Sequence, residues 1–205
     1  MNNKIKYSGL LTFTLSIVAF LLDAVSTISS FDSINTLTGT DKTVAMIVAC
    51  GELAICLVII VNSLFGIRYL LKPKDNFAAT RRGIDGLGCF AIYIAIITAF
   101  SLWDLVTYAK ENGYDYSIPI SSYVIIGLFF VGSLLALVGS SKKLPLSKSI
   151  KCGLGLLACL LIFVAYIFVM TTGSNQQMFF WAFSITYLTS IVVLAAFIFF
   201  SMEVK

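Results

Sequence analysis

The chain lacks histidine entirely and carries few charged residues, and each shortage narrows what it can do. None of its 205 residues is histidine, the side chain that most often serves as a general acid or base near neutral pH. Charged residues make up 12% of the chain, about half of the roughly 25% found in soluble domains. These shortages argue against a soluble fold, and we expect no nucleic-acid partner.

The motifs of several enzyme and metal-binding classes are also missing. No GxSxG, HExxH or Walker sequence occurs. The five cysteines show no CxxC or Cys/His grouping, so we interpret them as small core residues. We therefore expect a protein that is not an enzyme, with no cofactor and no metal site. Asp85, within RRGIDGLG (81–88), is expected to cap the start of a helix.

Long apolar runs fill almost the whole chain. Hydrophobic residues account for 59% of it, and the mean hydropathy is +0.98. The runs exceed the roughly 18 residues needed to cross a bilayer, and they are continuous rather than alternating, which favours helices over a β-barrel. The sequence thus predicts an all-α, polytopic transmembrane helical bundle, a single domain over residues 1–205. Its six spans are expected at about 7–29, 43–71, 84–109, 119–140, 150–172 and 177–201.

The positions of the basic residues predict the orientation. Of the 14 lysines and arginines, only Lys42 and Lys110 lie on the side opposite to the termini. Because basic loops stay in the cytoplasm, we predict a multi-pass protein of the cell (cytoplasmic) membrane with both termini cytoplasmic. The basic loop residues are expected to fix this topology and to contact anionic lipid headgroups; they are Lys72, Lys74, Arg81, Arg82, Lys142, Lys143, Lys148 and Lys151.

The first apolar run is expected to stay in the protein as a span. Lys4, Lys6 and the small residues at 24–26 resemble a secretory signal peptide. The run is longer than the 7 to 15 residues typical of a signal core, however, and Asp23 would lie inside the cleavage region. Retention of this run as a helix is the preferred interpretation.

Short similarities along the chain predict an internal repeat. VIIVNSLFG (58–66) resembles LFFVGSLLA (128–136), and AFLLDAV (19–25) resembles AFSLWDLV (99–106). These similarities predict three helical hairpins in parallel arrangement. The third hairpin differs, because Met170 stands where the other two carry an aspartate.

One acidic residue, Glu52, lies within the apolar run MIVACGELAICLVII (46–60). Helical spacing places Glu52 on a stripe of mostly small residues. Small residues let membrane helices approach closely, so we expect Glu52 to face other helices rather than lipid. The stripe comprises Ala45, Ala49, Cys56, Ile59, Ser63 and Gly66, and similar packing ladders are Gly132, Ala136 and Ser140 in the fourth run and Gly155 and Cys159 in the fifth.

Two interpretations of Glu52 remain open. A carboxylate near the bilayer centre costs about 2.5 to 3.5 kcal/mol on insertion scales and often marks an ion or proton route; alternatively, a protonated Glu52 is held by a hydroxyl from a neighbouring helix. Asp23 and Asp104 are either interface residues solvated from outside or parts of an outward-opening acidic vestibule. Asn62 and Ser63 are candidates for further oxygen ligands, although Asn62 is rotated about 80° from the Glu52 stripe.

Two functions fit these features. The first is a small transporter, channel or substrate-binding membrane subunit, in which an outward-facing acidic site centred on Glu52 binds a cation, a proton or a small molecule. The second is a non-catalytic accessory, regulatory or immunity protein that contacts a partner membrane protein, or another copy of itself, through its helices. What separates them is whether Glu52, Asp23 and Asp104 share one water-accessible cavity.

Overall fold

Six helices account for nearly all of the described chain. The computed structural model describes residues 3–71, 76–115, 117–172 and 178–203, and no strand occurs within these ranges. All six helices are long and apolar enough to cross a membrane, as expected of a multi-pass membrane protein. In chain order they are α1 (Asn3–Thr36), α2 (Gly39–Leu71), α3 (Asn76–Glu111), α4 (Ile120–Ser140), α5 (Lys148–Thr172) and α6 (Met178–Glu203).

The first three helices are much longer than a bilayer is thick. They have 34, 33 and 36 residues, which corresponds to about 50 Å each at 1.5 Å per residue, against a hydrocarbon core of about 30 Å. Their ends therefore extend beyond the expected spans. The early start of α3 corrects one expectation: Asp85 lies well inside the helix and does not cap it. Its carboxylate instead accepts a hydrogen bond from Ser140 Oγ of α4 at 3.3 Å.

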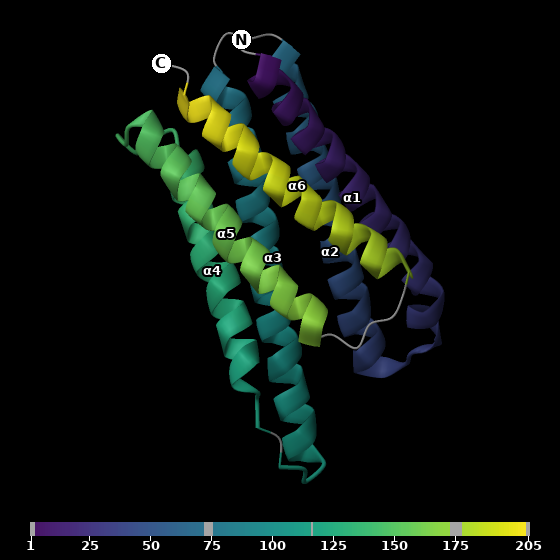
Figure 1. Cartoon of the computed structure of the whole chain (residues 1–205). Coiled ribbons are helices and arrows are strands. Elements are labelled where there is room, and N and C mark those ends of the chain that lie inside the picture. Colours follow the sequence, from purple (N-terminus) through teal and green to yellow (C-terminus); the bar gives the residue numbers. More distant parts are fainter. Residues whose placement is uncertain (1–2, 72–75, 116, 173–177, 204–205) are drawn as a thin grey trace.

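The helices pack as a ring in sequence order. Each contacts the next along the chain, and α6 closes the ring against α1, while α3 also reaches α1, α5 and α6. The start of α1 and the end of α6 lie at the same end of the bundle, and the α1–α2 and α3–α4 connections lie at the other (Figure 1). We call these the terminal end and the distal end.

The packing does not divide the ring into three hairpins. Helix α6 packs more extensively on α1 than on α5, and α5 packs more extensively on α4 than on α6. The fifth and sixth helices therefore do not form a separate pair of the kind that the repeat predicts. The repeat stays a prediction based on sequence similarity.

Small residues bring the helices close together. Phe13 of α1 occupies the space where Gly66 of α2 would otherwise carry a side chain. Gly139 of α4 packs against the backbone of Lys151 in α5, 2.9 Å from where its Cβ would lie. Such contacts supply the shape complementarity on which membrane helices depend, because lipid tails are as apolar as the side chains.

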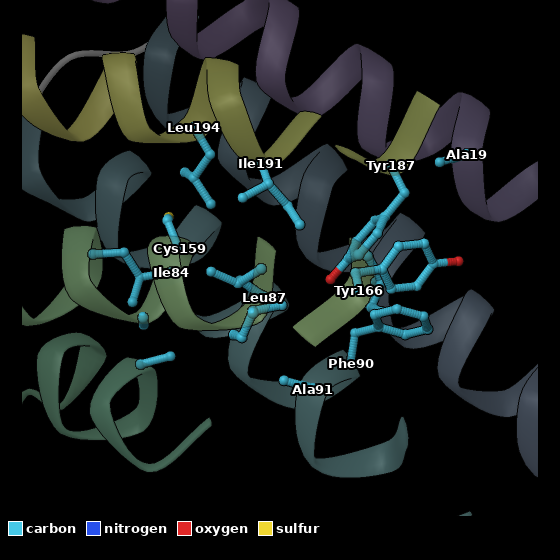
Figure 2. Close-up of a cluster of buried hydrophobic side chains, with 14 of the residues drawn as sticks. Ala19, Ile84, Leu87, Phe90, Ala91, Cys159, Tyr166, Tyr187, Ile191 and Leu194 are labelled. Carbon is cyan, nitrogen blue, oxygen red and sulfur yellow. The ribbon is translucent and has the colours of Figure 1, made fainter. Parts of the chain in front are cut away.

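Aromatic side chains fill the centre of the ring. Figure 2 shows Phe90, Tyr166 and Tyr187 converging from α3, α5 and α6. The ring centroid of Tyr187 lies 4.7 Å from that of Phe90 and 5.2 Å from that of Tyr166, in edge-on arrangements. Phe20 of α1 contributes a further ring, 4.9 Å from Phe90. Phe90 and Tyr166 of this cluster also line the cavity described next.

Candidate functional site

Asp23 and Glu52 line one cavity inside the helix ring. The cavity has a volume of about 260 Å³ and is bounded by α1, α2, α3, α5 and α6. Asp23 and Glu52 each lie about 5 Å from the midpoint of their helix, counted at 1.5 Å per residue, and both are displaced towards the distal end. The lining residues are Asp23, Ser26, Glu52, Phe90, Ile94, Thr98, Tyr166, Val169, Phe180 and Phe183.

Helical spacing aligns the polar groups of α1 with those of α2. Asp23 and Thr27 are four residues apart on α1, and Glu52 and Cys56 are four residues apart on α2, so each pair lies on one helix face. The two faces meet, because the Cys56 thiol donates a hydrogen bond to Asp23 Oδ2 at 3.4 Å. The Thr27 hydroxyl contacts the carboxyl group of Glu52. The four side chains therefore form one connected polar cluster.

The protein offers Asp23 little compensation for its charge. Asp23 is 9% exposed, and a thiol is a weak hydrogen-bond donor. The Thr27 hydroxyl donates at 3.0 Å to the backbone carbonyl of Asp23 rather than to its carboxylate. Among the described residues, the carboxylate of Asp23 therefore receives only one hydrogen bond, at one of its two oxygens.

Neither acid meets a positively charged side chain in the described part of the chain. The groups that act on Asp23 are Glu52 and Cys56, and the group that acts on Glu52 is Thr27. The cavity lining contains no lysine or arginine. Two carboxyl groups thus interact with each other across the α1–α2 interface without a counter-charge.

Asp104 is not brought to this cavity. It is exposed and lines a separate hollow of about 590 Å³ at the distal end, together with Asp41, Ser101 and Glu111. Asp104 lies about 16 Å from the midpoint of α3, at the edge of a 30 Å hydrocarbon core. The structure therefore joins two of the three predicted acids and separates the third.

Asn62 and Ser63 also lie away from the acidic cavity. Asn62 Nδ2 donates to the backbone carbonyl of Arg82 at 2.7 Å, and Arg82 Nη1 donates to Asn62 Oδ1 at 3.1 Å. The guanidinium lies 5.6 Å from the ring centroid of Phe65. Ser63 is buried and, with Asn62 and Arg82, lines a small cavity of about 20 Å³. The rotation of Asn62 away from the Glu52 stripe thus directs it to α3.

The basic residues at the terminal end differ in their exposure. Lys142 and Lys143 are exposed beside the α4–α5 connection, whereas Lys151 is 9% exposed and donates from Nζ to the carbonyl of Ser141 at 2.8 Å. Arg81 and Lys148 are half-buried. Lys72 and Lys74 lie outside the described residues. Lys151 therefore contacts the end of α4 rather than facing outward.

The predicted packing residues lie at helix contacts. A Cβ on Gly132 would lie 2.7 Å from Ile162, and one on Gly155 would lie 2.6 Å from Ile84. Glycine at these positions lets α4 approach α5, and α5 approach α3. Ala45 is half-buried, and the buried members are Ala49, Cys56, Ile59, Ser63, Gly66, Gly132, Ala136, Ser140, Gly155 and Cys159.

Sequence reasoning did not identify the aromatic wall of the cavity. Phe90, Tyr166, Phe180 and Phe183 come from α3, α5 and α6, and spacing along one helix does not show which neighbouring helix lies opposite. It also missed Thr27, which the four-residue spacing from Asp23 could have indicated. Within the described ranges, no group of three or more His, Cys, Asp or Glu side chains is placed to hold a metal ion.

Comparison with known proteins assigns the chain to no family. No family model, curated protein or solved structure matches it. Chemically, the lining of the cavity offers two carboxyl groups, three hydroxyl groups and four aromatic side chains. Such a lining can attract a positive charge and contact an apolar surface.

Proposed function

We propose that this chain is a small transport protein, namely a carrier, a channel or the substrate-binding subunit of a membrane transporter, whose cation site is the Asp23–Glu52 cavity. The observation that carries the proposal is the presence of two carboxyl groups in one cavity, with no lysine or arginine among the described residues that line it. The protein leaves their charge uncompensated, and the cavity leaves room for a ligand that compensates it.

Two neighbouring carboxylates are especially unfavourable inside a membrane. Ionised groups are poorly solvated in the hydrocarbon region, so a buried carboxylate must be neutralised by a proton or by a cation. Two adjacent carboxylates also repel each other more strongly at low dielectric constant than in water. A cation that enters relieves both penalties at once, and this supports a role for Glu52 and Asp23 in binding it.

We propose that both termini are cytoplasmic and that the cavity faces the outside of the cell membrane. Lys4, Lys6, Lys142 and Lys143 lie at the terminal end, and positive charge marks the cytoplasmic side of membrane proteins. Asp23 and Glu52 are displaced towards the opposite, distal end. An outward-facing site would therefore load from the external solution.

Flux measurements on reconstituted protein test this proposal. Liposomes with purified wild-type chain are expected to take up cations, and Glu52→Gln is expected to lower the rate at least tenfold, because it removes a charge with little change of shape. Asp104→Asn is the matched control, since Asp104 lies in another hollow, and its rate should stay within twofold of wild type. Equal rates for wild type and Glu52→Gln would contradict the proposal, and an absence of any cation flux would favour the accessory role.

A further inference from the structure

Aromatic side chains line the same cavity as the two acids. Phe90, Tyr166, Phe180 and Phe183 all line it, on α3, α5 and α6. Tyr166 lies close enough to interact electrostatically with both Asp23 and Glu52. The acids and the aromatic rings therefore line one cavity and not two neighbouring ones.

We propose that this cavity binds a small organic ammonium ion, with the ammonium group at Asp23 and Glu52 and the apolar body against the aromatic wall. The inference rests on the proposed function and adds the chemical class of the ligand. Aromatic faces attract cations, most strongly where water is excluded, and aromatic cages recognise quaternary ammonium groups. Carboxylates supply the full opposite charge that a neutral ring cannot.

The rings are held in place before any ligand arrives. Phe183 stacks on Tyr187 with centroids 5.7 Å apart and an interplanar angle of 17°. It meets Phe90 edge-on at 6.0 Å and Tyr166 edge-on at 6.2 Å. The Tyr166 hydroxyl is further fixed by Ser184, 3.2 Å away. Binding therefore costs little reordering of side chains, which favours affinity.

An inorganic cation fits this cavity less well. Dehydrated hard cations need about six to eight oxygen ligands at 2.0 to 2.6 Å, whereas the described residues place no group of three or more His, Cys, Asp or Glu side chains so that it could hold a metal ion. The volume of about 260 Å³ is close to the lower limit of about 300 Å³ for small-molecule pockets. A compact organic cation fills such a space and also uses its aromatic wall.

A neutral apolar molecule would match only half of the lining. It would contact the rings but would leave Asp23 and Glu52 without a counter-charge. Buried charges without a partner are costly, so the site should distinguish a cation from an uncharged molecule of the same shape. This difference separates the proposal from simple hydrophobic binding.

Equilibrium binding of phenyltrimethylammonium tests the inference. This ion keeps its charge at every pH, and binding can be followed by calorimetry on the full chain in nanodiscs of zwitterionic lipid. Saturable binding to wild type is expected. Phe183→Leu should weaken binding about tenfold, since a desolvated cation–π contact contributes about this factor. Phe197→Leu is the matched control: Phe197 is a buried α6 residue that packs on Phe13, outside the cavity lining, and its replacement should change the affinity less than twofold.

Two further measurements test whether binding depends on the charge of the site and of the ligand. Glu52→Gln is expected to weaken phenyltrimethylammonium binding at least thirtyfold. The uncharged isostere tert-butylbenzene, measured against empty nanodiscs, should show no specific binding to wild type. This ligand-side comparison also tests the inference if Phe183→Leu fails to fold.

The outcomes separate the inference from the proposed function. Glu52-dependent cation flux without phenyltrimethylammonium binding would overturn the inference alone. Equal binding of phenyltrimethylammonium and tert-butylbenzene would also overturn it. If the wild-type chain shows neither cation flux nor phenyltrimethylammonium binding, both the inference and the proposed function are overturned.

Discussion

Two polar sites within the helix ring differ in the sign of the charged groups that they hold. At the Asn62–Arg82 site, the cationic side chain donates to an amide oxygen and lies over the Phe65 ring, while the amide nitrogen donates to the Arg82 backbone. At the Asp23–Glu52 site, two acids act on each other, and the hydrogen bond to Asp23 comes from a thiol. Among the described residues neither site pairs its ionisable side chains with an opposite charge, and Arg82 Nε is buried without a hydrogen-bond partner. The second site differs because it brings two acids together beside a cavity of about 260 Å³.

The two sites also differ in their position along the helices. Arg82 lies about 17 Å from the midpoint of α3, near the edge of the hydrocarbon core, where a long side chain reaches the interface. Asp23 and Glu52 lie about 5 Å from the midpoints of their helices. The two acids thus lie nearer to the middle of their helices than Arg82 does. This difference supports the proposal that the acids bind a ligand, whereas the Asn62–Arg82 pair connects α2 to α3.

Within this comparison, the larger expected effect is the loss of cation binding in Asp23→Asn. The amide keeps the shape of the carboxylate and an oxygen that the Cys56 thiol can bond, but it removes the charge. Cation affinity should fall at least tenfold, while the midpoint of thermal unfolding should stay the same or rise, because a repulsion with Glu52 is removed. Binding and thermal unfolding measured on one preparation check both parts. A large loss of stability with unchanged affinity would make Asp23 a structural residue and would break the comparison.

A smaller effect is expected at the Asn62–Arg82 site, and on stability alone. Arg82→Met removes the hydrogen bond to Asn62 Oδ1 and should lower the unfolding free energy by about 1 to 3 kcal/mol. Cation affinity should not change. Combining it with Asn62→Leu in a double-mutant cycle should give a coupling energy of about 1 kcal/mol.

Unfolding in mixed micelles and cation binding are the two readouts for this cycle. A coupling energy near zero would show that the two side chains do not stabilise each other. A tenfold loss of cation affinity in Arg82→Met would show that the two sites act together, against their separation in the structure.

The fold class and the packed face of α2 could be predicted from the sequence alone. Continuous apolar runs leave helices as the way to satisfy the backbone in lipid, and six helices of spanning length are found. The four- and three-residue spacing around Glu52 predicted a face that includes Ala49, Cys56 and Gly66, which are buried. These are local properties, which a single helix encodes by itself.

Relations between helices could not be predicted in this way. Asp23 and Asp104 occupy similar positions in two similar sequence segments, yet Asp23 faces the ring interior and Asp104 lies exposed at its edge. The rotation and axial shift of each helix decide this, and both depend on which neighbours pack against it. The aromatic wall, built from α3, α5 and α6, depends on the same relations.

Thiol reactivity at position 52 tests the central claim most directly. Glu52→Cys, in a background without the five native cysteines, is treated with two membrane-impermeant methanethiosulfonates, one carrying trimethylammonium and the other carrying a sulfonate. Because Asp23 remains in the cavity, the ratio of the cationic to the anionic reaction rate is expected to exceed that of a free thiol in solution at least tenfold, and phenyltrimethylammonium should slow the cationic reaction. If neither reagent modifies position 52 while both modify Asp104→Cys, the cavity is closed to ions, and the account of a cation site is contradicted.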